Sequence, residues 1–239
     1  MPVEISVVVP VKDEAANAGP LAREIAAALA GEAPHEIIFV DDGSGDGTAE
    51  ALLALKPEIP ALRVLRHGRN LGQSRGIWTG VQAARGNVIV TLDGDGQNDP
   101  ADIPKLLRVL ETEPTVGLVS GVRTKRKDTF SRRLASRLGN RFRNWILKDG
   151  ATDTGCGLKA IRRPAFLALP YFDHFHRFLI ALVQRDGWQT RFVPVNHRPR
   201  LAGRSKYTNL GRLLVSVRDL LGVRWLLKRH GGKVDIREL

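Results

Sequence analysis

Two acidic side chains, Asp93 and Asp95, stand one residue apart directly after the apolar run 88–92. Carboxylates at this spacing can reach one hard cation, and Mg²⁺ or Mn²⁺ accepts such oxygen ligands while keeping positions for phosphate oxygens. The glycines at 94 and 96 allow the backbone to bend closely around a ligand. The alternative interpretation is an acidic turn that caps the helix expected from Pro100, because Asp-Gly pairs are common in turns.

A second acidic pair, Asp41 and Asp42, ends another apolar run at 36–41. A carboxylate there can accept hydrogen bonds from a ribose or a base, as an acidic residue does in dinucleotide-binding folds. No Gly-x-Gly-x-x-Gly follows the first apolar run at 5–10, which argues against a dinucleotide dehydrogenase. The segment 9–14 follows that run and can line the same pocket. The alternative for Asp41 and Asp42 is a turn with a helix cap, to which Asp46 would belong.

The elements that must position these residues alternate in type over the first 121 residues. The pattern predicts strands at 5–10, 36–41, 62–65, 88–92 and 116–120, and helices at 20–30, 47–55, 72–84 and 100–111. Such alternation predicts an α/β fold with a Rossmann-like, mostly parallel sheet flanked by helices. Ligands bind outside the carboxyl ends of strands in such sheets, which is where both acidic pairs fall.

After Gly121 the alternation stops. We expect a basic helix at 130–147, a Thr/Gly-rich turn at 153–157, two short helices, a strand at 190–195 and a final amphipathic helix at 210–228. In the basic helix, apolar residues recur at spacings of three and four with arginines between them: Phe130, Leu134, Leu138, Phe142, Trp145 and Ile146. This pattern is typical of a helix in an anionic membrane interface, and the alternative is a surface helix packed on the core.

The final helix carries a similar apolar set: Leu213, Leu214, Val217, Leu221 and Trp225. For this helix, core packing and a membrane-protein partner both remain open. His174 and His176 do not share one helical face, so we interpret them as packing or pocket-edge residues rather than metal ligands.

The chain of 239 residues has a formal net charge of +12, which indicates an anionic partner such as nucleic acid, an acidic membrane or a phosphorylated substrate. Ten bases and one acid lie between 123 and 148. No nucleic-acid recognition motif is present and aromatic residues make up only 6%, so we expect no nucleic-acid partner. The single cysteine excludes an internal disulfide, and we expect no signal peptide and no transmembrane helix.

Four motifs follow one another along the chain: Val8–Glu14, Val40–Ser44, Arg69–Gly72 and Asp93–Gln97. Their order and spacing resemble those of the inverting family 2 glycosyltransferases with the GT-A fold, and the chain resembles the dolichol-phosphate mannose synthase type most. The chain departs from the family's usual Asp-Ala-Asp-Leu-Gln in its two glycine spacers, and we expect none of the C-terminal transmembrane helices that other relatives carry.

The resemblance implies a role for each matching position. Pro10 and Glu14 would border the nucleotide, with Asp41 or Asp42 on its base or ribose. Asp93, Asp95 and Gln97 would hold Mg²⁺ or Mn²⁺. Arg123, Arg132, Arg133 and Ser136 would contact an acceptor phosphate. A late basic loop with Arg200, Arg204, Ser205 and Lys206 would close over the diphosphate. Asp95, Arg123 and Lys206 would be catalytic.

These roles define the expected activity. We expect an inverting, metal-dependent transfer of a hexose from GDP-mannose or a UDP-sugar to a polyprenyl phosphate, dolichyl or undecaprenyl. A phosphate nucleophile needs no protein base, since its second pKa is roughly 6. The alternative acceptor is a saccharide hydroxyl in cell-envelope polysaccharide synthesis, and Asp153 would then be the base. A nucleotidyltransferase is less favoured, because no glycine-rich basic loop follows the first strand.

The same resemblance implies a division of the chain. We expect a catalytic domain at 1–208, with a nucleotide-sugar-binding part at 1–122 and an acceptor-binding part at 123–208, followed by a helix and tail at 209–239. The protein would be cytoplasmic and peripheral on the cytoplasmic face of the membrane.

Overall fold

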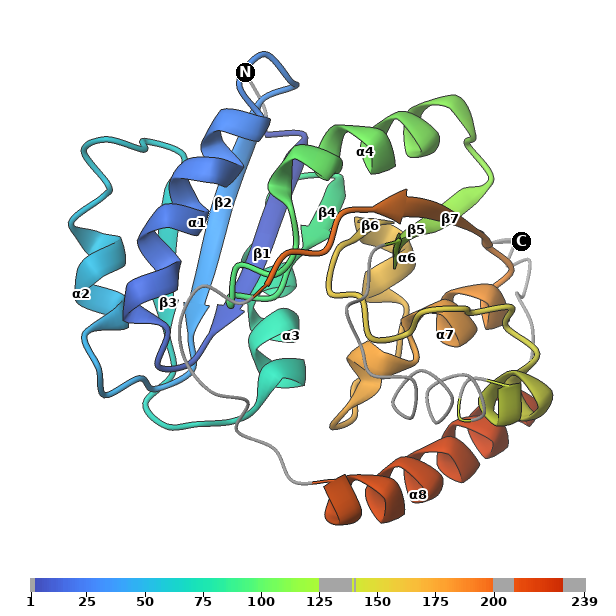
Figure 1. The fold of residues 1–239 in the computed structure, drawn as a ribbon. Coiled ribbons are helices and arrows are strands. Elements are labelled where there is room, and N and C mark those ends of the chain that lie inside the picture. The colour runs from blue at the N-terminus through green and yellow to red at the C-terminus, as the bar shows by residue number, and fades with distance from the viewer. Residues whose placement is uncertain (1–2, 125–138, 140, 200–208, 230–239) are drawn as a thin grey trace, which may run out of the picture.

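The computed structural model describes residues 3–124, 139, 141–199 and 209–229, with the side chains of the last segment described from Ser216 onward. Its centre is a seven-stranded sheet in the order β3-β2-β1-β4-β6-β5-β7 (Figure 1). The strands are β1 (Ile5–Val11), β2 (His35–Asp41), β3 (Leu62–Arg66), β4 (Val88–Thr91), β5 (Val116–Arg123), β6 (Lys159–Arg162) and β7 (Gln189–Val195).

The sheet is mostly parallel, as the alternating pattern predicted. β1 pairs in parallel with β2 and β4, β2 with β3, and β5 with β7. Only β6 runs antiparallel, between β4 and β5. The carboxyl ends of β1, β2 and β4 therefore meet at one edge, and the loops that carry both acidic pairs leave from that edge.

Helices cover both faces of the sheet. They are α1 (Ala15–Ala28), α2 (Thr48–Leu53), α3 (Gln73–Ala83), α4 (Ile103–Thr112), α6 (Arg163–Leu167), α7 (Leu179–Arg185) and α8 (Asn209–Lys228), with short 3₁₀ turns η1 (Pro100–Asp102) and η2 (Phe175–Arg177). Alternate residues of each strand point to opposite faces. Val7 and Val9 belong to the core cluster that includes residues of α1 and α4, whereas Val8 packs against α3 in the cluster on the other face, which also includes residues of α7 and α8.

Two expectations differ from the structure in this part of the chain. α1 begins at Ala15 rather than at residue 20, because the amides of Asn17 and Ala18 close its first turn on the Glu14 carbonyl before Pro20 is reached. β6 was not expected at all. It is only four residues long, and the charged residues Lys159 and Arg162 at its two ends hide its apolar middle.

The final helix is confirmed, but its apolar residues lie on two sides. Leu220 and Val223 are buried in the core, whereas Val217, Leu221 and Trp225 are exposed. Core packing is therefore the wrong interpretation for these three exposed residues. No helix in the described ranges is long and apolar enough to cross a membrane.

Close packing of α3 on β1 gives a test of the fold. A Cβ at Gly80 would lie 2.3 Å from Val8 Cγ1, deep in the sheet. We expect Gly80→Ala to lower the free energy of unfolding by about 1–3 kcal/mol, because overpacking forces backbone shifts. Gly222→Ala on α8 meets nothing within 4 Å and should be neutral or stabilising by up to about 1 kcal/mol. Denaturant unfolding measures both, and equal stabilities would contradict the packing.

Candidate active site

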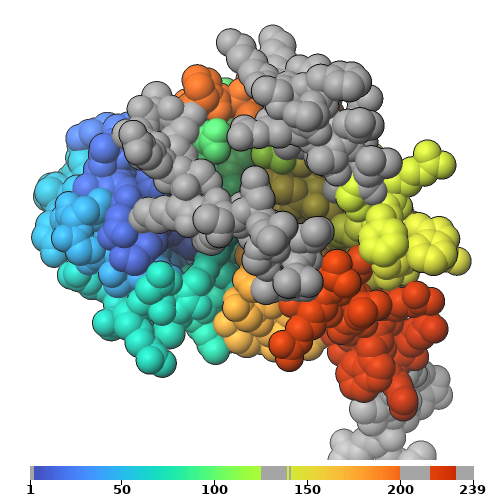
Figure 2. Space-filling view, turned by 60° about the horizontal axis from the view of Figure 1, so that its bottom comes forward, coloured from blue at the N-terminus to red at the C-terminus, as the bar shows by residue number. Residues whose placement is uncertain are grey.

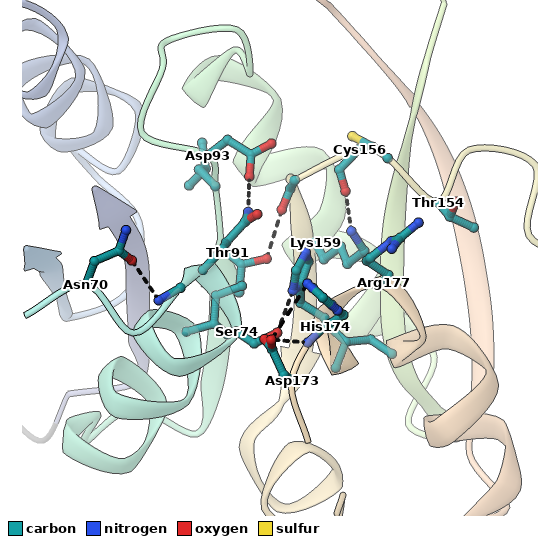
Figure 3. A pocket seen from close by; sticks show the side chains of 18 residues that line it. Asn70, Ser74, Thr91, Asp93, Thr154, Cys156, Lys159, Asp173, His174 and Arg177 are labelled. Carbon is teal, nitrogen blue, oxygen red and sulfur yellow. Dashed lines mark hydrogen bonds and ion pairs between the residues drawn. The ribbon is translucent and has the colours of Figure 1, made fainter. Parts of the chain in front are cut away.

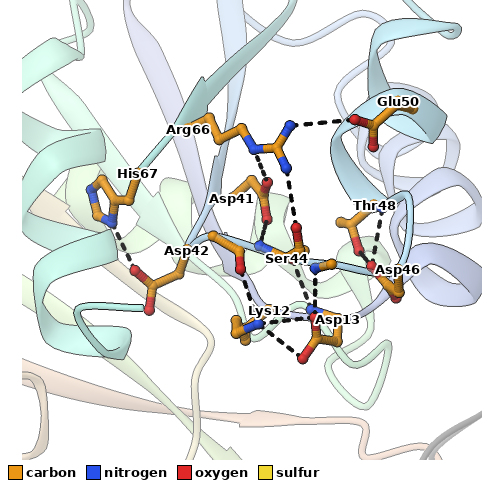
Figure 4. Close-up of polar contacts among 12 residues, drawn as sticks. Lys12, Asp13, Asp41, Asp42, Ser44, Asp46, Thr48, Glu50, Arg66 and His67 are labelled. Carbon is orange, nitrogen blue, oxygen red and sulfur yellow. Dashed lines mark hydrogen bonds and ion pairs between the residues drawn. The ribbon is translucent and has the colours of Figure 1, made fainter. Parts of the chain in front are cut away.

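The loops after β1 and β2 are bound to each other at the carboxyl edge of the sheet (Figure 4). The Lys12 ammonium contacts the Asp13 carboxylate at 2.9 Å and the Gly43 carbonyl at 3.0 Å. The Asp13 amide donates to Ser44 Oγ at 2.8 Å, and Asp13 itself has a positive φ of 51°. A non-glycine residue held in this conformation costs free energy, so the surrounding contacts must fix the loop in place.

Asp41 and Asp42 are both buried and both accept protein donors. The Asp41 carboxylate accepts the Ser44 amide at 3.0 Å and lies 3.2 Å from Arg66 Nε. Asp42 accepts backbone amides of the loop that precedes α3, and its carboxylate lies 2.8 Å from the His67 ring. The two carboxylates thus hold the loop after β2 and the loop before α3 in place. A nucleotide-binding role for either carboxylate stays a prediction.

Pro10 and Glu14 lie in the same region. Pro10 pairs in register with Val40 at the end of β2, and the Glu14 amide donates to Thr48 Oγ1 at 2.9 Å. The N-cap of α2 is Gly47 rather than the predicted Asp46, although the Asp46 carboxylate accepts the Thr48 amide at 3.1 Å. The structure therefore gathers Pro10, Glu14, Asp41 and Asp42 at one edge, as expected.

The loop after β4 places Asp93 on the wall of a pocket. Gln73 from the first turn of α3 donates to Asp93 Oδ1 at 2.7 Å, and the Asp93 amide donates to Asn98 Oδ1 at 3.1 Å. Asp95 is partly exposed, and its carboxylate accepts the Gln97 amide at 3.1 Å. Two carboxylates thus lie on one short loop, close enough for the charge of Asp95 to act on Asp93, and carboxylate oxygens are the ligands that a hard divalent cation prefers.

Arg198 connects this loop to the chain that leaves β7, and sequence reasoning missed it. Its amide donates to the Gln97 carbonyl at 2.9 Å, and its guanidinium contacts both Asp99 and Glu24, the latter at 2.8 Å. The Gln97 side-chain amide also points toward the Arg198 carbonyl, at 3.5 Å. The basic residues after β7 indicated that this segment could belong to the site, but nothing in the sequence distinguished Arg198 from Arg200.

Arg123, at the end of β5, forms a bidentate ion pair with Asp153. Arg123 Nε lies 2.7 Å from Asp153 Oδ2, and Nη2 lies 2.6 Å from Oδ1, with 15% and 7% of the two side chains exposed. Burial alone would lower the pKa of Arg123, but the hydrogen bond and the charge of Asp153 raise it above its ordinary value. Arg123 was expected to bind a phosphate acceptor and Asp153 to be the base for a hydroxyl acceptor. The structure pairs these two residues with each other.

A pocket of about 730 Å³ opens beside Asp93 (Figure 3). Its walls come from the start of α3, the end of β4, the turn at 154–157, β6 and the segment 173–179. His174 and His176 both line it, which agrees with their interpretation as pocket-edge residues. The turn at 154–157 approaches closely, since a Cβ at Gly157 would lie 2.3 Å from the Asp93 carboxylate.

Lys159 is a pocket group that sequence reasoning missed, because β6 and its register were not expected. The Lys159 ammonium is buried and donates to the Cys156 carbonyl. Burial lowers its pKa, against the charges of Cys156, Asp93 and Asp153. Burial and the nearby charge of Lys159 lower the pKa of His176 to about 3, so the ring is neutral at physiological pH. His176 Nδ1 lies 2.7 Å from Ser74 Oγ.

Asp93 has an unusual electrostatic environment. Burial and the neighbouring charge of Asp95 raise its pKa to about 6 from an ordinary 3.8, although Lys159, Arg123 and Gln73 oppose the shift. Among the described residues, no three His, Cys, Asp or Glu side chains converge into a complete metal-binding cluster. Two repelling carboxylates fit a cation whose other ligands come from a substrate.

Seven expected site residues lie outside the described ranges. They are Arg132, Arg133, Ser136, Arg200, Arg204, Ser205 and Lys206.

The fold is that of the GT-A glycosyltransferases. Mannosyl-3-phosphoglycerate synthase from Rubrobacter xylanophilus superposes with a TM-score of 0.67 at 19% identity, over 99% of this chain and 77% of that one. Glucosyl-3-phosphoglycerate synthase from Mycobacterium tuberculosis, crystallised with Mn²⁺ and UDP-glucose, superposes with a TM-score of 0.64 at 22% identity, over 98% and 81%.

The sequence matches the model of glycosyl transferase family 2 over residues 6–169. Dodecaprenyl-phosphate galacturonate synthase from Rhizobium johnstonii is 37% identical over 231 residues, covering 94% of this chain and 68% of the relative. Undecaprenyl-phosphate 4-deoxy-4-formamido-L-arabinose transferase from Yersinia enterocolitica is 36% identical over 221 residues, covering 91% and 66%. The chain spans about two thirds of the length of these relatives. The chain belongs to glycosyl transferase family 2, and it is a glycosyltransferase.

The raised pKa of Asp93 gives a prediction about stability. An unfolded aspartate ionises near 3.8, so the folded protein loses stability as the pH rises through about 6. We expect Asp93→Asn, without metal, to raise the free energy of unfolding at neutral pH by about 1–2 kcal/mol, allowing for water that reaches the pocket. The gain should shrink as the pH falls toward the ordinary pKa of aspartate.

Thermal unfolding across this pH range measures the effect, and Glu58→Ala is the control, because its ion pair with Arg23 is exposed. Adding Mn²⁺ with a nucleoside diphosphate should stabilise the wild type and not Asp93→Asn. A metal-free Asp93→Asn protein that is less stable than the wild type at neutral pH would contradict the raised pKa of Asp93.

Proposed function

We propose that this glycosyltransferase moves a hexose from a nucleoside diphosphate sugar to a polyprenyl phosphate, with inversion and with Mg²⁺ or Mn²⁺. The observation that carries the proposal is the pair Asp93 and Asp95 at the end of β4, beside a pocket that holds the buried cation of Lys159. The names of the two curated relatives support the lipid-phosphate acceptor, and the M. tuberculosis complex supports the metal and the nucleotide sugar.

In this proposal the leaving nucleoside diphosphate lies along the carboxyl edge of the sheet. Asp93 and Asp95, with Gln97, hold the cation, which neutralises charge on the departing diphosphate. Pro10, Glu14 and one of Asp41 and Asp42 border the nucleotide. The loop with Arg200, Arg204, Ser205 and Lys206 adds positive charge on the leaving group. Described residues up to Pro199 support this placement, since Arg198 is bound to the Gln97 carbonyl.

The Arg123–Asp153 ion pair favours a phosphate acceptor over a hydroxyl. A hydroxyl needs a base, but both oxygens of Asp153 already accept hydrogen bonds from Arg123. A lipid phosphate needs no base and is bound well by the planar fork of an arginine. We propose that Arg123 exchanges part of its contact with Asp153 for the acceptor phosphate, with Arg132, Arg133 and Ser136 from the acceptor-binding part at 123–208.

The expected location follows from the acceptor. A polyprenyl phosphate is held in a membrane, so the protein acts as a peripheral protein at the cytoplasmic face. We retain an anionic membrane surface as a partner, and a membrane-protein partner as the alternative.

Asp95 provides the test of the donor site. We expect Asp95→Ala to lower the rate of metal-dependent transfer by about a thousandfold or more, because the diphosphate would lose its cation. The assay follows release of nucleoside diphosphate from a panel of labelled nucleotide sugars, with and without polyprenyl phosphate. Glu58→Ala should keep the wild-type rate. Full activity of Asp95→Ala would refute the metal assignment, and no release with any lipid phosphate would refute the acceptor.

Asp153 separates the two acceptor classes. If the acceptor is a phosphate, Asp153→Asn should keep the rate constant for transfer within about tenfold while changing the KM for the lipid, since Arg123 loses its anionic partner. If the acceptor is a hydroxyl activated by Asp153, that rate constant should fall by about 10²–10⁴. Steady-state kinetics with each acceptor distinguishes these outcomes, and a fall of that size with polyprenyl phosphate would contradict the proposal.

A further inference from the structure

Five large apolar side chains stand exposed on two neighbouring helical segments, and we call them the apolar face. They are Phe142 (53% exposed), Trp145 (70%), Val217 (41%), Leu221 (55%) and Trp225 (60%). Phe142 and Trp145 lie on the helical segment 141–147 and their rings stack at 6.2 Å, and the other three lie on α8. Exposure of two tryptophans on one small region is costly in water and marks an interaction site.

The spacing on α8 shows that the exposure is systematic. Val217, Leu221 and Trp225 recur every fourth residue, so they form one stripe along the helix. Leu220 and Val223, which are buried, fix the opposite side of α8 in the core, and Leu147 of the other segment packs in the same core cluster. The two segments therefore lie side by side, as the views in Figures 1 and 2 show.

The charged side chains around the apolar face are basic. Exposed bases on the same two segments are Arg141, Lys148, Arg218, Arg224, Lys228 and Arg229. Asp219 is the one acid among the described side chains of α8, and its carboxylate lies 3.1 Å from His174 Nδ1. The Arg229 guanidinium lies over the Trp225 ring at 5.8 Å. A surface that combines exposed tryptophan with exposed positive charge complements an anionic lipid interface.

We propose that the apolar face docks on an anionic lipid bilayer, with Trp145, Trp225 and Leu221 inserted at the level of the headgroups. This inference rests on the proposed function, because a lipid-phosphate acceptor has to be reached in a membrane. The long side chains of Arg224 and Lys228 extend beside the apolar stripe and place their charges at the lipid phosphates.

Contacts between α8 and the pocket give the docking a catalytic consequence. Arg177 donates to Ser216 Oγ at 2.8 Å, and His174 contacts Asp219, so the first described turns of α8 hold two residues that line the pocket. A protein docked through α8 therefore holds the rim of its pocket near the membrane surface. The acceptor's phosphate then needs to move only a short way to reach the pocket.

Vesicle cosedimentation tests the proposal with the full chain. The vesicles are phosphatidylcholine alone, or phosphatidylcholine with phosphatidylglycerol. We expect binding only to the anionic vesicles, and we expect Trp145→Ser/Trp225→Ser to weaken it about tenfold or more. The matched control is Leu53→Ser, since Leu53 is 50% exposed on α2, away from the apolar face (Figure 1). Circular dichroism checks that each variant is folded.

A second variant tests the charge. Arg224→Gln/Lys228→Gln should weaken binding to anionic vesicles roughly thirtyfold, since each base near such a surface contributes about 1 kcal/mol. Unchanged binding in both double variants would overturn the proposal, as would equal binding to neutral vesicles. Self-association that disappears in Trp145→Ser/Trp225→Ser would assign the face to a second copy of the chain instead.

Activity separates this inference from the proposed function. With a short-chain polyprenyl phosphate in detergent, both double variants should keep the wild-type rate, and with the lipid in vesicles they should lose it in proportion to binding. Normal transfer without any vesicle binding would refute the docking and leave the function intact. Vesicle binding without transfer to lipid phosphate would refute the function and leave the docking intact.

Discussion

Burial of the Asp93 carboxylate beside Asp95 dominates the electrostatics of this site. Burial and the charge of Asp95 raise the pKa of Asp93 to about 6, although Lys159 and Arg123 partly offset the shift. In water the two groups would separate, but here Gln73 and Asn98 hold Asp93 in position. In the proposed function a cation offsets this negative charge, and its binding would recover the stability that the folded protein loses at neutral pH.

The arrangement depends on segments from the whole length of the chain. β4 lies between β1 and the antiparallel β6, so its end lies between the loop that follows β1 and Lys159 at the start of β6. Arg198, which follows β7, fixes the far side of the Asp93–Gln97 loop by bonding to Gln97 and Asp99. The same sheet edge that presents carboxylates therefore also holds cations from the second half of the chain, Lys159 and Arg198.

Much of the first half of the fold could be predicted from the sequence, because strands buried on both faces give continuous apolar runs and helices give a 3.6-residue period. Once the strands were predicted from these patterns, the acidic motifs could be placed at the strand ends. β6 could not be predicted, since four residues with lysine and arginine at the ends give no periodic signal. Lys159 was missed for that reason, and the pairing of Arg123 with Asp153 was missed because it depends on tertiary geometry. The exposed stripe of α8 was visible as apolar spacing, but only the packing shows which side faces the core.

The most direct test of the account is the position of Mn²⁺ in crystals grown with a nucleoside diphosphate, located by anomalous diffraction. The account predicts one peak within about 2.0–2.3 Å of an Asp95 oxygen, shared with diphosphate oxygens and close to Asp93. The nucleoside should then extend toward Asp41 and Asp42. A metal peak bound away from both Asp93 and Asp95, or a diphosphate bound there without any metal, would contradict the account.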